Sequence, residues 1–244
     1  MSEIRSNISL LEIKDDKAIL TIDNGAKNLL SVPEFFSLDL LKETIEANPQ
    51  LKALIITGAG RHFSHGADTT KFSPEGLSDI PESLRKSREL LNYIEALPLV
   101  TVAAVNGGCF GGGMEVAMSC QFRVCNRSAV FALPETSIGV IPGMSGVERL
   151  TRLVGKSKAI SLVLSGSMIS ASEALELGIV DLATEDKNCL DKAIEFASEL
   201  TADRTVLQIN SVIKRVNKAL ASVETDVNDN TFERILEEKL NNNG

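Results

Sequence analysis

The chain of 244 residues lacks the features that would place it in several common protein classes. It has no run of basic residues, and 33 Asp and Glu against 25 Lys and Arg give a net charge of −8. A nucleic-acid surface needs clustered lysine and arginine, so we expect no nucleic-acid partner. No apolar run reaches the roughly 18 residues of a membrane span, and the N-terminus lacks the apolar core of a signal peptide. We therefore expect a soluble protein with no membrane association.

Cysteine and histidine are also scarce, and their placement argues against the usual metal sites. The cysteines show no pair spacing typical of zinc ligands, and both histidines lie far from them in the sequence. We therefore expect no metal, reduced thiols and a cytoplasmic location. These residues are Cys109, Cys120, Cys125 and Cys189, with His62 and His65.

Apolar sequence is plentiful, at 43% of residues, and is arranged in alternating strand-like and helix-like segments. Residues 54–58 and 99–105 are continuous apolar runs, typical of strands buried on both faces. Ser31 is placed to cap a helix that ends before Pro49. Strand–helix units followed by helices predict an α/β architecture. Further strands are expected at 8–13 and 18–22, and further helices at 82–97, 188–200, 204–220 and from Ser170 onward.

A glycine-rich stretch follows the second apolar run. The chain passes there from a strand into a helix near Gly112, so free backbone N–H groups lie at a helix N-terminus. If an amide from the Gly66–Ala67 bend points at the same spot, the two amides form an oxyanion hole, which would stabilise a thioester enolate. A dinucleotide-binding loop is the alternative, but no early strand–glycine–helix unit with a following acidic residue accompanies the stretch.

Two glutamates stand beside these bends in an otherwise apolar region. Glu115 falls in the first turn of the expected helix, and Glu135 directly follows a proline. In an apolar pocket such a pair can hold different protonation states, so that one acts as a base and the other as an acid. Hydration of a double bond conjugated to a carbonyl requires that division. The alternative for Glu115 is structural, as a charge that stabilises the helix dipole.

Several segments, in a fixed order, carry a resemblance to a known family. They lie at residues 54–58, 63–68, 98–107, 111–115, 131–135, 139–143, 149–150 and 171–180. Through them the sequence resembles the crotonase superfamily, also called the enoyl-CoA hydratase/isomerase family, over nearly its full length. The resemblance implies a crotonase (ClpP/crotonase-like) fold, a spiral of ββα units. It implies a core domain at 1–190, a C-terminal helical trimerisation region at 191–244, and homotrimers or hexamers made of two trimers.

The resemblance also implies roles for individual residues. The thioester oxygen would lie between the backbone amides of Ala67 and Gly112. Glu115 would be the general base toward water, Glu135 the acid toward the α-carbon, and the amide of Gly143 would help to hold the water. Coenzyme A enters as part of the substrate, and no further cofactor is implied. Along the coenzyme A and substrate strip we expect Ser64, His65, Gly66, Asp68 and Gly111.

Because both glutamates are present, the resemblance favours a hydratase or its reverse, a dehydratase. A family isomerase or decarboxylase is the first alternative, and a non-catalytic scaffold or RNA-binding member is the second. The family's usual C-terminal motif is not recognisable in this sequence, so a phosphopantetheine arm on a carrier protein is an alternative to coenzyme A. Met114, Met144 and the loop at 71–81, a candidate lid, are expected to shape the acyl pocket.

Overall fold

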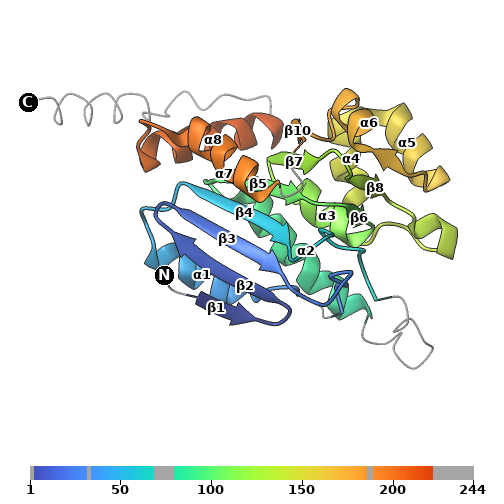
Figure 1. The fold of residues 1–244 in the computed structure, drawn as a ribbon, viewed down its shortest axis with the longest axis horizontal. Coiled ribbons are helices and arrows are strands. Elements are labelled where there is room, and N and C mark those ends of the chain that lie inside the picture. Colours follow the sequence, from blue (N-terminus) through green and yellow to red (C-terminus); the bar gives the residue numbers. More distant parts are fainter. Residues whose placement is uncertain (1–2, 32–33, 69–79, 186–188, 222–244) are drawn as a thin grey trace, which may run out of the picture.

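The computed structural model describes residues 3–31, 34–68, 80–185 and 189–221 (Figure 1). Most of the predicted lid and residues 222–244 of the predicted C-terminal region lie outside these residues. The described residues form two sheets and the helices around them, an α/β arrangement as predicted. In chain order the elements are β1 (Glu3–Ser6), β2 (Ser9–Lys14), β3 (Lys17–Ile22), α1 (Leu38–Ala47), β4 (Ala53–Gly58), α2 (Ile80–Ala96), β5 (Val100–Val105), β6 (Gly108–Phe110), α3 (Gly112–Ser119), β7 (Phe122–Asn126), β8 (Val130–Ala132), η3 (Glu135–Ile138), α4 (Gly146–Val154), α5 (Lys156–Ser165), β9 (Ile169–Ser170), α6 (Ala171–Glu176), β10 (Leu182–Thr184), α7 (Leu190–Thr201) and α8 (Val206–Ala221).

The larger sheet has seven strands in the order β1-β2-β3-β4-β5-β7-β10. The first three strands pair antiparallel, and the pairs from β3 to β10 are parallel. A parallel pair needs a crossover connection, which α1 supplies between β3 and β4 and α2 between β4 and β5. The carboxyl ends of β4 and β5 therefore meet at one edge of the sheet.

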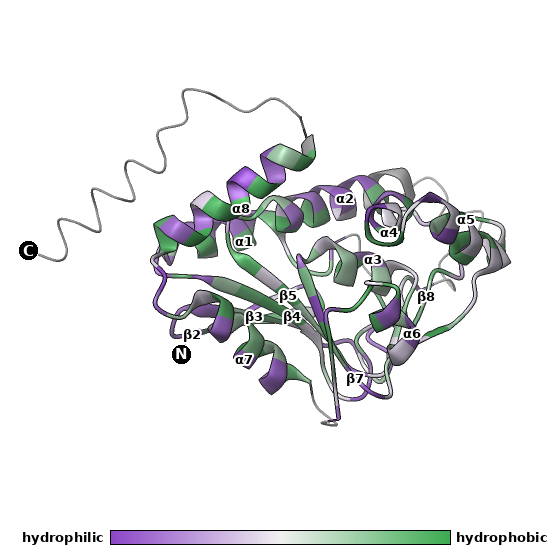
Figure 2. Cartoon of the chain, turned by 90° about the horizontal axis from the view of Figure 1, so that it is seen from above, coloured by the Kyte–Doolittle hydropathy of each residue, from purple (hydrophilic) through white to green (hydrophobic). Residues whose placement is uncertain are grey.

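Strands β4 and β5 are buried on both faces, as their apolar runs predict. Leu54 and Ile56 of β4 belong to a core shared with α1, α2 and α3. Ala53 and Ile55 alternate with them and belong to a second core, shared with α7. Figure 2 shows the strands between α7 on one side and α1 and α2 on the other. Each large side chain buried here contributes about 1.5–3 kcal/mol, so these strands are a firm base for the loops at their ends.

A three-stranded sheet, β6-β8-β9, lies beside the large one. Strand β6 occupies three residues of the glycine-rich stretch, between β5 and α3, and the sequence analysis did not predict it. Every residue of α3 is buried, although a helix usually leaves one face to solvent. Gly113 permits this packing, because a Cβ there would lie 2.5 Å from the backbone oxygen of Ser64.

The prediction that Ser31 caps the first long helix is wrong. Ser37 is the N-cap of α1, and its side chain accepts a hydrogen bond from the Leu40 N–H at 3.3 Å. Phe36, which is wholly buried, stands before the helix rather than inside it. The helix predicted from Ser170 onward is confirmed as α6, and Ser170 and Glu173 form a capping box at its start.

Helices α7 and α8 are the described part of the predicted C-terminal region. Helix α7 packs on the sheet, whereas α8 leaves Val212, Val216 and Leu220 exposed by 62%, 52% and 79%. These positions are four residues apart and share one helix face, and an apolar stripe of this kind is typical of an interaction surface. The domain boundary after residue 190 and the trimerisation role stay predictions.

All four cysteines are free and buried. Burial raises the pKa of each thiol, to about 12 for Cys120, Cys125 and Cys189. In the described part of the chain no group of three His, Cys, Asp or Glu side chains is arranged to hold a metal ion. None of the described helices is both long and apolar enough to span a membrane.

Candidate active site

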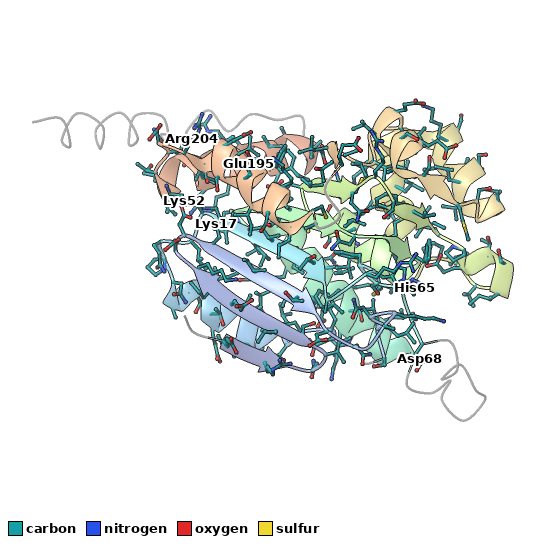
Figure 3. The ribbon with its side chains drawn as sticks, in the orientation of Figure 1. Lys17, Lys52, His65, Asp68, Glu195 and Arg204 are labelled. Atoms are coloured by element: carbon teal, nitrogen blue, oxygen red, sulfur yellow. The ribbon has the colours of Figure 1, made fainter. Side chains whose placement is uncertain are left out.

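Two loops meet at the carboxyl ends of β4 and β5. Residues 59–68 follow β4. Residues 106–107 join β5 to β6, which leads on into α3. Backbone hydrogen bonds join the two segments, including one from Phe110 N to Ser64 O at 2.9 Å. Ligand sites of open α/β sheets form at this edge. Figure 3 labels His65, in the first loop, at the end of the molecule away from α8.

Two backbone amides from these segments lie side by side. A Cβ on Gly66 would lie 3.0 Å from the amide nitrogen of Gly112, and a Cβ on Gly112 would lie 3.8 Å from that of Ala67. Gly66 also has φ +79°, a conformation that favours glycine. Among the described residues neither the Ala67 nor the Gly112 N–H has a hydrogen-bond partner. Gly112 is the first residue of α3, where helical N–H groups are free.

Glu115 lies in the first turn of α3, as predicted. Its side chain is only 2% exposed, and Oε1 accepts hydrogen bonds from Met144 N at 2.7 Å and Gly146 N at 2.8 Å. Burial raises the pKa of Glu115 to about 7, and the charge of Glu135 adds to the rise. The two N–H donors and the charge of Arg149 act in the opposite direction. The carboxyl group is therefore held in place and titrates near neutral pH.

Glu135 reaches the same place from η3, after β8. A Cβ on Gly111 would lie 3.0 Å from Glu135 Oε1, so this carboxyl group lies over the residue that precedes the Gly112 amide. Its Oε2 is buried and has no hydrogen-bond partner among the described residues. Burial raises the pKa of Glu135. The structure thus brings the two predicted glutamates to the start of α3 and puts them in different surroundings.

The loop from 142 to 146 supplies the donors to Glu115. Ser145, at its tip, has φ 66° and ψ 31°, the left-handed conformation that directs neighbouring N–H groups to one side. The carbonyl of Gly143 accepts from Arg88 Nε at 2.6 Å. A Cβ on Gly143 would lie 2.8 Å from Leu84 Cδ2, so α2 packs directly on this loop. The predicted role of the Gly143 amide toward water stays a prediction.

The first loop has a support that the sequence analysis did not single out. Asn28 is wholly buried, and its Nδ2 donates to the carbonyls of Ala59 at 2.9 Å and His62 at 2.8 Å. Ser64 is also wholly buried, and its hydroxyl donates to Asn28 O and accepts from Gly66 N. In this structure Ser64 therefore supports the loop through its side chain. An asparagine in a turn is common in sequences, so only the contacts identify Asn28.

His65 and Asp68 occupy the outer part of the same loop. The His65 ring packs edge-on against His62 and Phe110, with centroids 4.5 Å and 5.0 Å away. His62 Nδ1 accepts from Gly108 N at 2.9 Å, so this ring is held as a neutral acceptor. Burial lowers the pKa of both histidines. Figure 3 shows Asp68 where the described part of the loop ends, and its contact with substrate stays a prediction.

A groove of about 1130 Å³ lies elsewhere, between α8 and the ends of α3 and α4. Its lining contains neither of the two glutamates, so its size does not mark it as the reaction site. Exposed apolar side chains of α8 form one wall, and Glu95, Arg149 and Arg152 lie in the other. The chemistry therefore points to the start of α3 rather than to this groove.

A family model described as enoyl-CoA hydratase/isomerase matches residues 15–242, which is nearly the whole chain. The chain belongs to the enoyl-CoA hydratase/isomerase family. The predicted membership of the crotonase superfamily is therefore confirmed, and the order of the shared segments is explained. The family name covers more than one reaction, so the assignment of a reaction depends on the site described above.

Relatives and solved structures agree with this membership. A Bacillus subtilis (strain 168) protein named "Probable enoyl-CoA hydratase" is 38% identical over 197 residues, 80% of this chain and 75% of the relative. The crystal structure of enoyl-CoA hydratase from Bacillus anthracis has a TM-score of 0.79 at 28% identity, covering 95% of this chain and 90% of its own. Pseudomonas aeruginosa DspI has a TM-score of 0.84 at 26% identity, covering 96% and 90%. The predicted crotonase fold is confirmed by these likenesses.

Proposed function

We propose that this family member adds water to, or removes it from, the α,β-double bond of an acyl-CoA thioester. The observation that carries the proposal is the pair of carboxyl groups with raised pKa values beside two neighbouring amides that have no hydrogen-bond partner within the described ranges. The amides of Ala67 and Gly112 would form an oxyanion hole for the thioester oxygen. Such a hole stabilises the enolate that forms when water adds to the β-carbon.

The surroundings of the two glutamates support a division of roles. Glu115 has two N–H donors on one oxygen, which favour its charged form, so it is suited to remove a proton from water. Oε2 of Glu135 is buried and has no donor among the described residues, which favours the neutral form of this carboxyl group, so Glu135 is suited to give a proton to the α-carbon. In hydration the hydroxide adds to the β-carbon and the enolate collapses as the α-carbon is protonated. The Gly143 amide would hold the attacking water.

The rest of the proposal concerns binding and assembly. Coenzyme A, as part of the substrate, would lie along the loop that contains Ser64, His65, Gly66 and Asp68, and across Gly111. We propose a homotrimer or a hexamer, supported by the exposed apolar stripe of α8. A cytoplasmic location is supported by four cysteines that are all free.

The test follows the loss of absorbance of the conjugated enoyl thioester, with crotonyl-CoA and longer enoyl-CoAs. The wild type should hydrate at least one, and Glu115→Gln and Glu135→Gln should each lose at least about a hundredfold in rate, the usual effect of a positioned acid or base. Glu148→Gln, an exposed position on α4, is the matched control and should keep full activity. A wild type that leaves every enoyl-CoA unchanged would refute the proposal, and double-bond isomerisation or decarboxylation would be tested next.

A further inference from the structure

A buried arginine joins helix α2 to the loop that holds Glu115. Arg149 is 3% exposed and uses all three side-chain nitrogens. Nε donates to Glu95 Oε2 at 3.0 Å, Nη2 to Asn92 Oδ1 at 3.0 Å, and Nη1 to the carbonyl of Met144. The planar guanidinium can make such bonds in fixed directions, which a lysine cannot. The arginine therefore fixes Met144 relative to α2.

Met144 is also the residue whose N–H binds Glu115. Its carbonyl accepts from Arg149, while its amide donates to Glu115 Oε1 at 2.7 Å. Ser145, next in the chain, has φ 66°, and a residue other than glycine rarely adopts this conformation without support. This conformation lets the Met144 and Gly146 amides converge on one carboxylate oxygen. A loop in this geometry needs anchors: Arg88 holds the Gly143 carbonyl, and Arg149 holds Met144, the residue that binds Glu115.

We propose that Arg149, held by Asn92 and Glu95 of α2, is a positioning residue that sets the orientation of Glu115 for catalysis. This inference rests on the proposed function, in which Glu115 is the general base. Arg149 makes no hydrogen bond to Glu115 and acts through the Met144 backbone. Its positive charge also favours the ionised carboxylate. Without the Arg149 contacts Met144 should shift, and its N–H, which lowers the pKa of Glu115, should donate less well, so the base is misplaced and harder to ionise even where a lysine keeps the charge.

The chain offers two matched controls. Arg152 also binds Glu95, at 2.8 Å, but is exposed and has no contact with Met144 among those the structure gives. Arg123 is 2% exposed and, like Arg149, binds backbone carbonyls and one carboxylate, that of Asp181. Loss of Arg152 tests the ion pair without the loop contact. Loss of Arg123 tests the general effect of altering a buried arginine.

The experiment measures kcat, KM and the pH profile of enoyl thioester hydration for Arg149→Lys, Asn92→Ala, Arg152→Ala and Arg123→Lys. We expect Arg149→Lys to lower kcat at pH 7 about 10- to 100-fold, because a small displacement of a catalytic group has an effect of this size. KM should change little, and the acid limb of the profile should move to higher pH. Asn92→Ala, at an exposed position, should cause a smaller change in the same direction. Arg152→Ala should match the wild type, and Arg123→Lys should alter thermal stability without moving the profile.

A second readout does not depend on activity. The titration of Glu115 is followed by NMR with ¹³C-carboxyl-labelled glutamate, and its signal is assigned by its loss in Glu115→Gln. Arg149→Lys should move this titration to higher pH, and Arg123→Lys should leave it in place. If wild type is inactive on every thioester, the proposed function fails, but the Glu115 titration still tests whether Arg149 orients Glu115. An unchanged Glu115 titration in folded Arg149→Lys, or equal effects in the Arg149 and Arg123 variants, would overturn the inference.

Discussion

Gly146 offers a direct test of how closely Glu115 is held. It is the first residue of α4, and a Cβ there would lie 2.8 Å from both Cγ and Oε1 of Glu115. Both distances are shorter than real Cβ contacts, so Gly146→Ala must displace the carboxyl group. The backbone itself does not oppose alanine, because the position is helical, and alanine suits a helix better than glycine by up to about 1 kcal/mol.

The size of the effect follows from the bonds that the displacement breaks. Oε1 of Glu115 accepts from Met144 N and from Gly146 N. A hydrogen bond to a charged group contributes about 1.5–3 kcal/mol, so loss of one bond together with weakening of the other gives about 2–4 kcal/mol. If the transition state loses this much stabilisation, hydration slows about 30- to 1,000-fold. Both donors also lower the pKa of Glu115 from the value that burial alone would give, so the acid limb of activity should move to higher pH.

The assay compares kcat and thermal unfolding for Gly146→Ala and for a control with the opposite pattern. Gly155 has φ +77° and open space around a Cβ, so Gly155→Ala should lower stability by about 1–2 kcal/mol through backbone strain. It should leave kcat unchanged, since Gly155 lies at the other end of α4. Gly146→Ala should lose activity out of proportion to any loss of stability. Full activity in a folded Gly146→Ala would refute the close contact with Glu115.

Other perturbations have equally definite expectations. Glu115→Gln should raise the free energy of unfolding by up to about 3 kcal/mol at pH 8 and by little at pH 4.5. The pKa of Glu115 is about 7 in the folded state and lower in the unfolded state, so the cost of burying its charge grows as the pH rises from the lower pKa to the higher one. Equal gains at both pH values in denaturant titrations would contradict this. Asn28→Ala should destabilise by about 1–3 kcal/mol, since two half-buried carbonyls lose their donor, and should raise KM by loosening the first loop. Ala67→Pro removes one amide N–H and should lower kcat about 100- to 1,000-fold, and retained hydration by the folded variant would exclude Ala67 from the oxyanion hole. RNA binding should be undetectable even at low salt, given the net charge of −8, and a measurable shift in a filter-binding assay would reopen that role.

The parts of the fold that the sequence predicted well are those controlled by neighbouring residues. The run at 54–58 predicts a buried strand because it carries three large apolar side chains in succession and no charge, and both faces of β4 are indeed covered. Glu115 was placed in the first turn of a helix because the glycines before it end a strand. Ser31 and Ser37 both precede helix-like sequence, and local pattern does not distinguish them. Burial of Phe36 ahead of the helix decides between them.

The supports of the site could not be predicted, because each joins segments far apart in the chain. Asn28 binds carbonyls more than thirty residues away, and Arg149 binds α2 residues 54 and 57 positions earlier. A buried arginine looks like any other arginine in a sequence. The resemblance to a family drew attention to residues 149–150 but implied no role for Arg149. Only the contacts show that it holds the backbone beside Glu115.

The buried thiols have a practical consequence for following this protein in solution. Thiolate is the reactive form of cysteine, and with thiol pKa values far above neutrality the four native cysteines are shielded both by burial and by protonation. A single cysteine placed at an exposed site such as Met168, which is 74% exposed, would then take up a maleimide dye alone. One batch would carry a donor dye and another an acceptor dye. After mixing, energy transfer between the dyes would report how fast copies of the chain exchange between assemblies. Met168 is the one native residue replaced for this experiment.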